Sequence, residues 1–158
     1  IVRSAEEIKD KGLEFKKGQL REMKALCGAV NDICALTVDS FCRNDVEQAI
    51  HVEPLEEVVD TLCKTIKENH IKRLKKGKST IEMGFILDDV LTGLERVSDH
   101  CSNIAVEMIT ILDDDFDTHE YFESLSGEDR KNFNKEYEEL IKQYPISKKE
   151  IEQSKNAQ

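Results

Sequence analysis

Tryptophan is absent from this sequence of 158 residues, which contains only two prolines, seven glycines, six phenylalanines and three tyrosines. Proline and glycine interrupt helices, so their scarcity, together with a charged fraction of 35%, fits an all-helical protein. With so few aromatic side chains, the core of such a protein must be mostly aliphatic.

Basic residues are outnumbered by acidic ones, 23 to 33, which gives a formal net charge of −10. A nucleic-acid backbone is bound by a clustered basic face, so this balance disfavours nucleic acid as a partner. The sequence also lacks a glycine-rich phosphate loop and a nucleophile beside an obvious general base. Nothing in it therefore argues for an enzyme.

Paired cysteine motifs are missing as well. The five cysteines are odd in number and contain no C-x-x-C pair, which argues against a disulfide framework and against a thiolate zinc site. Buried free thiols in a reducing cytoplasm account for them better. No long uncharged hydrophobic run is apparent, so we expect no segment that spans a bilayer and no signal peptide. The cysteines are Cys27, Cys34, Cys42, Cys63 and Cys101.

Apolar residues recur every three or four positions over most of the chain, which is the spacing of helices that bury one face. Residues 1–11 read as the end of a helix that stops near Gly12. A long helix over about 16–43 follows, and we expect Asn44 to begin the next one, with Glu47 completing a capping box. The expected inward residues of the helix over 16–43 are Leu20, Met23, Cys27, Val30, Cys34, Thr37 and Phe41.

A second long helix is expected next, and Pro54 either kinks it or marks a restart at its first turn. Gly77 breaks the pattern, and Ser79 with Glu82 forms a second capping box before a third helix over 80–112. Because the links are short, the three helices should pack up-down-up. The expected inward residues are Leu55, Val58, Val59, Leu62 and Ile66 in the second helix, and Leu87, Val90, Leu91, Leu94, Val97, Cys101, Ile104, Met108 and Ile111 in the third.

The predicted fold class is therefore all-α. An antiparallel three-helix bundle occupies residues 13–112, after a helix remnant over 1–12 and before a more polar, helical C-terminal extension over 113–158. The elements expected in the extension are a helix over 116–125, one capped by Ser126 with Asp129 that ends before Pro145, and a fragment capped by Ser147 with Glu150.

Two acid pairs stand one helical turn apart in the second and third helices, Glu56 with Asp60 and Glu95 with Asp99. If the chain reverses at Gly77, the outer acid of each pair lies 21 or 22 residues from the turn and the inner acid 17 or 18. The four carboxylates then occupy matched levels, in two rungs about 6 Å apart. That spacing suits one or more metal ions bridged by carboxylate oxygens.

Solvation offers a plainer account of these acids, because a chain with 33 acidic residues produces several such pairs by composition alone. No histidine completes the Glu-x-x-His spacing of di-iron bundles, so oxygen-only ligation remains, with His100 nearby. Asp32 and Asp39 are weaker candidates for the same groove. A carboxylate-metal hydrolase would need a nucleophile and a general base that the sequence does not show.

One basic cluster interrupts the acidic sequence, at residues 72–78. Its place at the end of a helix suits the helix macrodipole, and a solvated helix end is the simplest interpretation. Contact with anionic lipid or with an acidic partner is the alternative. Arg96, beside Glu95, is a candidate for a surface ion pair or for a phosphate contact.

Two of the expected helices resemble a known family. Residues 94–105, LERVSDHCSNIA, closely resemble the ERIGDHAENIAE type of signature of PhoU-like domains, and residues 56–74, EEVVDTLCKTIKENHIKRL, resemble the second helix of that family. The likeness covers about residues 16–112 as one three-helix repeat. Residues 11–23, KGLEFKKGQLREM, resemble the linker that follows a preceding repeat, so residues 1–11 would be the tail of that repeat.

The C-terminal sequences DTHEYFESL at 117–125 and EYEELIKQYPI at 136–146 resemble the ending of PhoU-like domains attached to sodium/phosphate cotransporters. The resemblance thus implies a regulatory, non-catalytic PhoU-like domain that modulates sodium-coupled phosphate transport on the cytoplasmic side of the cell membrane. The implied partners are the transmembrane part of the same polypeptide and, in a homo-oligomer, a second copy, without direct membrane insertion. An opening at Ile1 rather than methionine fits an excised piece of such a protein.

Members of this family can hold multinuclear iron or zinc clusters on their acid motifs. The resemblance implies that the metal ligands of this chain are Glu56, Asp60, Glu95 and Asp99. The sequence departs from the family pattern at Ser98, where glycine is usual, and at Pro54. The other functional interpretation is a structural helical module for oligomerisation or membrane-side docking, with solvated carboxylates and no metal site.

Overall fold

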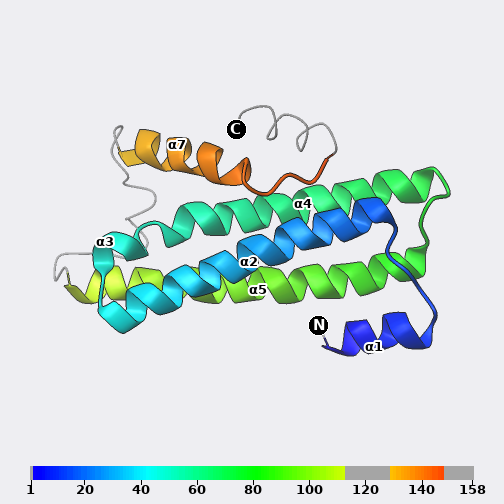
Figure 1. Cartoon of the computed structure of the whole chain (residues 1–158), viewed down its shortest axis with the longest axis horizontal. Coiled ribbons are helices and arrows are strands. Elements are labelled where there is room, and N and C mark those ends of the chain that lie inside the picture. The colour runs from blue at the N-terminus through cyan, green and yellow to red at the C-terminus, as the bar shows by residue number, and fades with distance from the viewer. Residues whose placement is uncertain (1, 113–128, 148–158) are drawn as a thin grey trace.

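The computed structural model describes residues 2–112 and 129–147, and all the regular structure in these ranges is α-helical. Three long helices, α2 (Lys17–Arg43), α4 (Val52–Lys75) and α5 (Ile81–Leu112), lie side by side as an antiparallel bundle (Figure 1). The all-α class and the up-down-up order predicted from the sequence are confirmed. The shorter helices around the bundle are α1 (Val2–Asp10), α3 (Val46–Ala49) and α7 (Asp129–Ile141).

Residues in the left-handed backbone region follow three of the helices. Gly12 and Gly77, with φ angles of 59° and 64°, follow α1 and α4 as predicted, since glycine adopts this region without steric cost. Asn44 has a φ angle of 53° and ends α2, so its predicted role at the start of the next helix is wrong. Asp45 caps α3 instead, because its Oδ1 accepts a hydrogen bond of 3.0 Å from the Gln48 amide.

The N-termini of α4 and α5 settle two further predictions. Pro54 lies in the first turn of α4, where a missing N–H removes no intrahelical bond, so the predicted restart is confirmed. The predicted cap at Ser79 is wrong by one residue, because Thr80 Oγ1 accepts a hydrogen bond of 3.2 Å from the Met83 amide. The Ser79 hydroxyl lies 3.5 Å from His70 Nδ1 instead.

The buried face of α2 differs in part from the predicted one, although Val30 and Thr37 are buried as expected. Leu20 and Phe41, which the heptad pattern points inward, are 54% and 63% exposed, whereas Leu26, Ala29 and Ile33 are fully buried. α2 is apolar over much of its circumference, so two apolar series interleave and periodicity alone selects the wrong one. The residues that α2 buries are Gln19, Glu22, Leu26, Ala29, Val30, Ile33, Thr37 and Ser40.

The burial of the cysteines also differs in part from the prediction. All five are free, but only Cys63 and Cys101 are buried, so the expectation of buried thiols holds for part of the set. Cys27 and Cys42 are exposed because they lie on the solvent side of α2. Cys34 is partly exposed, and its Sγ contacts Cys101 Sγ at 3.8 Å.

The apolar character of α2 also corrects the expectation that no segment could span a bilayer. By length and mean hydropathy, α2 is apolar enough to cross a membrane, and within the described ranges no other helix is. The core helix of a bundle passes the same test, and α2 contacts both α4 and α5. Packing accounts for part of this composition, since 33% of the apolar window of α2 is buried in the structure.

The predicted stripe of α5 is confirmed as buried at Leu87, Val90, Leu91, Leu94, Cys101 and Met108, but one row of it turns outward along the helix. Val90, Ile104 and Ile111, one or two heptads apart, are 8%, 43% and 74% exposed, in that order. A straight helix drifts about 20° per seven residues against a strict heptad, so each repeat of the stripe lies further outward. Ala105 takes the inward place of Ile104, with an exposure of 4%. The inward residues predicted for α4 are confirmed as buried, namely Leu55, Val58, Val59, Leu62 and Ile66.

α7 packs against α4 and holds part of the C-terminal extension on the bundle (Figure 1). The hydroxyls of Tyr137 and Thr61 lie 3.0 Å apart, and beyond the helix the Tyr144 hydroxyl donates a hydrogen bond of 2.7 Å to Asp32. The predicted helix before Pro145 is confirmed. The predicted elements that lie outside the described residues are the helix over 116–125 and the caps that involve Ser126 and Glu150.

A buried ion pair joins α2 to α4. Arg73 pairs with the Glu22 carboxylate, and Asn69 Nδ2 donates a hydrogen bond of 2.9 Å to the same oxygen. The side chains of Arg73 and Glu22 are only 19% and 5% exposed. Apolar periodicity does not reveal this pair, because a single acid on an apolar face carries no periodic signal.

We expect Arg73→Met to lower the free energy of unfolding by about 3 kcal/mol, since it leaves the Glu22 carboxylate buried without its counter-charge. Lys72→Met is the matched control. Lys72 pairs with Glu68 at 3.7 Å, but both side chains are more than half exposed, so this loss should stay below about 1 kcal/mol. Chemical denaturation of the 158-residue chain measures both values, and equal losses would contradict a structural role for the buried pair.

Candidate metal centre

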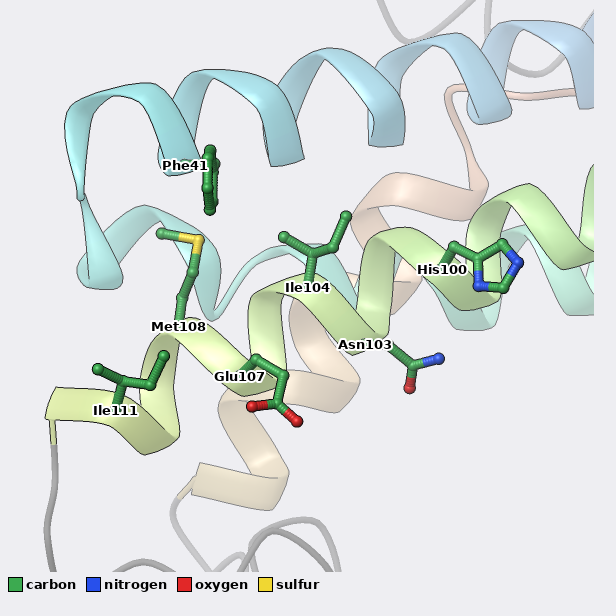
Figure 2. A pocket seen from close by; sticks show the side chains of 7 residues that line it. All are labelled: Phe41, His100, Asn103, Ile104, Glu107, Met108 and Ile111. Atoms are coloured by element: carbon green, nitrogen blue, oxygen red, sulfur yellow. The ribbon is translucent and has the colours of Figure 1, made fainter.

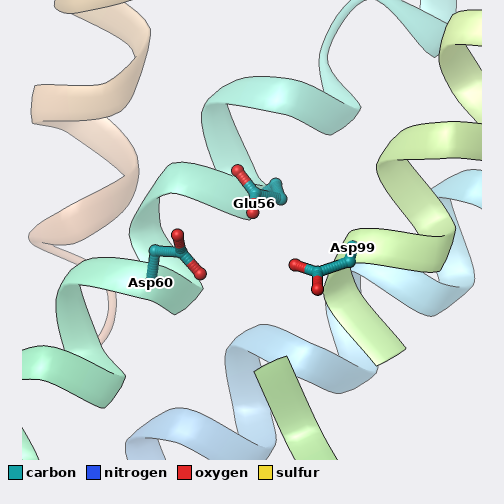
Figure 3. Close-up of side chains that lie close together, drawn as sticks. All are labelled: Glu56, Asp60 and Asp99. Atoms are coloured by element: carbon teal, nitrogen blue, oxygen red, sulfur yellow. The ribbon is translucent and has the colours of Figure 1, made fainter. Parts of the chain in front are cut away.

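Three carboxylates meet on one face of the α4/α5 pair. Glu56 and Asp60 project from α4 and Asp99 from α5, and one oxygen of each lies within 4.8 Å of the others (Figure 3). Glu56 and Asp60 are half-buried, whereas Asp99 is exposed. The antiparallel register thus brings acids of the two helices to one level, as their distances from Gly77 indicate.

Glu95, the fourth acid of the predicted set, does not join this group of three. Its Oε2 lies 3.4 Å from Lys67 Nζ, which also lies 3.6 Å from Asp88 Oδ1. The ion pair with Lys67 accounts for the separation of Glu95 from the group of three, because the Lys67 ammonium on α4 attracts the Glu95 carboxylate and the other acids do not. Glu95 still acts on the site through its charge, which contributes to the raised pKa of Asp60.

Burial and mutual repulsion both act on the three acids. Burial, followed by the charge of Asp60, raises the pKa of Glu56 to about 8. Burial, followed by the charges of Glu95 and Asp99, raises the pKa of Asp60 above its ordinary value. Asp60 Oδ1 is buried without a hydrogen-bond partner, and no basic side chain in the described ranges pairs with any of the three acids. The site therefore concentrates negative charge that the described part of the chain does not balance.

Glu53 extends the acidic group by one turn, at a spacing of three residues from Glu56 that the four-residue acid pairs do not include. The Ser102 hydroxyl of α5 donates a hydrogen bond to Glu53 Oε2, and burial raises the pKa of Glu53. The spacing of three residues between Glu53 and Glu56 is the signal that points to it. That signal is weak in a chain with 33 acids, which is why sequence reasoning passes over it.

The donor set fits a hard divalent cation. Carboxylate oxygens bind such ions at about 2.0–2.6 Å, so oxygens around one ion lie within about 4–5 Å of one another. One oxygen from each of Glu56, Asp60 and Asp99 meets that limit. The unpartnered Asp60 Oδ1 also supplies a free lone pair, so these residues are compatible with a shared ion.

The other candidate ligands lie elsewhere. Asp39 pairs with Arg43 at 3.0 Å and Asp32 accepts from Tyr144, so neither acid of α2 joins the three carboxylates. His100 follows Asp99 on α5 but is not part of the group of three acids, and it lines a groove of about 450 Å³ between α2 and α5 (Figure 2). The other residues that line this groove are Phe41, Asn103, Ile104, Glu107, Met108 and Ile111.

The raised pKa of Glu56 predicts how stability depends on pH in metal-free protein. Because the folded-state pKa of about 8 exceeds the ordinary value of 4.5, the folded state binds more protons between these pH values. The free energy of unfolding should therefore fall as the pH rises from about 4.5 to about 8. Glu56→Gln removes this contribution, so the variant should be more stable than the wild type at pH 8 and lose that advantage toward pH 5.

Urea denaturation in the presence of a chelator, at pH 5 and at pH 8, measures the effect. Glu57→Gln is the matched control, because Glu57 is the next residue on α4 and is exposed. The control should keep the pH dependence of the wild type. Identical pH profiles for the wild type and Glu56→Gln would show that Glu56 is not protonated in the folded state.

The chain is similar in sequence to proteins of one known family. The PhoU domain matches residues 23–108, which is more than half of the chain and includes all three clustered acids. The chain is also 26% identical over 98 residues to a protein of Thermotoga maritima named phosphate-specific transport system accessory protein PhoU homolog 1. The aligned segment covers 62% of this chain and 42% of that relative, so the chain spans less than half of the relative's length. No solved structure matches the chain.

The family match agrees with the sequence motifs and with the fold. The likeness to PhoU-like domains at residues 56–74 and 94–105 is confirmed, and both segments lie on the helices that carry the acids. The all-helical bundle over the matched residues is consistent with the same assignment. The chain belongs to the PhoU domain family.

Proposed function

We propose that this chain is a regulatory, non-catalytic domain that modulates phosphate transport and binds a divalent metal ion through Glu56, Asp60 and Asp99. Membership of the PhoU family and the name of the relative, an accessory protein of phosphate-specific transport, support the regulatory part. The uncompensated group of three carboxylates carries the metal-binding part, because like charges at this separation repel unless a cation shares them.

Oxygen-only ligation narrows the choice of ion. Carboxylates suit hard ions such as Mn²⁺, and they also bind Zn²⁺ and Fe²⁺, which the resemblance to PhoU-like proteins favours. When bound, the ion supplies positive charge between α4 and α5. Glu95 would reach it only after release from Lys67, so Glu95 belongs to the edge of the proposed site.

The site also gives a physical route to regulation. Glu56 and Asp60 come from α4 and Asp99 from α5, so an ion held by all three links the two helices directly. Without an ion, repulsion acts across the same pair of helices. Metal occupancy would therefore bias how firmly α4 and α5 pack, which is a change that a contacting protein can sense.

The transporter that we propose as the target is a sodium-coupled phosphate transporter. The likeness of residues 136–146 to the ending of PhoU-like domains on such transporters supports this choice. In this arrangement the chain lies on the cytoplasmic side of the membrane and its partner is the transmembrane part of the same polypeptide. A second copy of the chain is the other partner that we propose.

Added Mn²⁺, Zn²⁺ or Fe²⁺ should stabilise the wild-type chain by about 2.7 kcal/mol when the free ion is at a hundred times its dissociation constant. Asp99→Asn should abolish most of this gain, since it removes the charge of the one ligand of the three that comes from α5. Chelator-treated protein titrated with each ion, with unfolding followed by circular dichroism, measures the gain.

Asp89→Asn provides the matched control, because Asp89 is an exposed acid on the same helix and lies outside the group of three. It should respond to metal as the wild type does. Glu95→Gln should keep most of the response as well. If no ion stabilises the wild type, or if Asp89→Asn and Asp99→Asn lose equally, the metal site is disproved.

Deletion of residues 1–158 from the transporter should remove the adjustment of phosphate uptake to external phosphate, and Asp99→Asn in the intact protein should weaken it. Uptake of labelled phosphate by cells grown at low and high phosphate measures both. Unchanged uptake after deletion would argue against regulation. A normal response in Asp99→Asn, with a lost response after deletion, would separate regulation from metal binding.

A further inference from the structure

The end of the bundle at the α4–α5 turn is strongly basic. Residues 72–81 contain five basic side chains and no acid, in a chain whose net charge is −10. Lys75, Lys76 and Lys78 are exposed, and none of them forms an ion pair with another residue of the described ranges. Lys16 Nζ donates a hydrogen bond of 3.0 Å to the Lys78 carbonyl, which brings a fourth exposed lysine to the turn. We call these four lysines the basic tip.

Large apolar side chains are exposed beside the basic tip. Ile71, Ile81 and Phe85 are 53%, 65% and 72% exposed. Lys67 on α4 and Asp88 on α5 lie at the same level of the outer α4/α5 face, since Lys67 Nζ is 3.6 Å from Asp88 Oδ1. Ile71 stands one turn from Lys67 and Phe85 one turn from Asp88, both toward the turn, so they share that face at the next level.

The two features form one surface. Ile81 lies one turn beyond Phe85 on α5, and Lys75 lies one turn beyond Ile71 on α4, so lysine borders the apolar side chains on the side of the turn. Isolated exposed apolar residues need no explanation, but a group of three that is bordered by unpaired cations is typical of an interaction surface. We propose that this surface docks on an anionic lipid bilayer.

Charge complementarity favours lipid as the occupant. The chain as a whole is repelled by a negative surface, and the basic tip is the part whose charge reverses that repulsion. Lysine ammonium groups pair with lipid phosphates without fixed geometry, while the apolar side chains enter the boundary between head groups and acyl chains. Phe85 and Ile81 are suited to that boundary because they carry no polar atom that needs a partner there.

Docking of this kind would fix the distance of the acidic site from the membrane. Phe85 and Asp99 lie 14 residues apart on α5, which corresponds to about 21 Å along the helix. The carboxylates would therefore stay clear of the lipid head groups. The proposal does not depend on metal binding, because no residue of the docking surface belongs to the group of three acids.

Sedimentation of the 158-residue chain with vesicles tests the proposal. The chain should bind vesicles of phosphatidylcholine with about one third phosphatidylglycerol at about 0.1 M salt, and it should bind pure phosphatidylcholine at least about tenfold more weakly. The triple variant Lys75→Glu, Lys76→Glu and Lys78→Glu should lose at least about tenfold in affinity for the anionic vesicles. Phe85→Ser should weaken binding about tenfold while the preference for anionic lipid persists.

The matched controls carry the same kinds of substitution at positions outside the docking surface. The triple variant Lys131→Glu, Lys135→Glu and Lys142→Glu alters exposed lysines of and just after α7, and Phe41→Ser alters a phenylalanine that is 63% exposed at the other end of the bundle. Both controls should bind as the wild type does, and circular dichroism verifies that every variant is folded. Equal losses in variants and controls, equal binding to neutral and anionic vesicles, or no binding to either would overturn the proposal. In the last case the surface would fit an acidic protein instead of lipid.

Discussion

Much of the structure depends on the register of α4 and α5, and His70 packs closely against Gly84 where these two helices meet. A Cβ at position 84 would lie 2.8 Å from His70 Nε2, so any larger residue would displace the ring or separate the helices. Burial lowers the pKa of His70, so the ring is neutral near physiological pH and packs without an added charge. With the helices held at this level, Lys67 reaches Asp88, and farther along Asp99 meets the acids of α4.

Lys67 divides the outer α4/α5 face into two surfaces. Its pairing with Asp88 and Glu95 satisfies the charges at the middle of the face. On one side lie three acids that form no ion pair with the described residues, and on the other side lie exposed apolar residues and lysines. The same face of the α4/α5 pair therefore carries an acidic surface and a surface of lysines and apolar side chains.

The parts of the structure that sequence predicts well are those that depend on local geometry. The reversal at Gly77 and the rise of a helix are enough to place the acid pairs at matched levels. The position of Glu95 is not predictable in this way, because it depends on the reach of Lys67 from another helix. The prediction of the buried face of α2 is partly wrong for a different reason. Leu20 and Leu26 belong to two interleaved apolar series, and only the packing of the bundle shows which of them is buried. The exposure of Ile104 reflects the slow rotation of a straight helix against a strict heptad.

Glu22 and the group of three acids differ in how their charge is balanced, and the difference bears on function. At Glu22 the chain supplies an arginine and an amide from α4. At Glu56 and Asp60 it supplies neither within the described ranges, although Asp60 Oδ1 is shielded from water. Simple solvation therefore accounts for exposed Asp99 but not for Asp60. The remaining sources of positive charge are a bound cation and a proton, and the pKa of about 8 means that Glu56 keeps a proton near neutral pH when no cation is bound. At the proposed metal site, cation binding and proton release would be one equilibrium, since a ligand carboxylate must lose its proton to bind the ion.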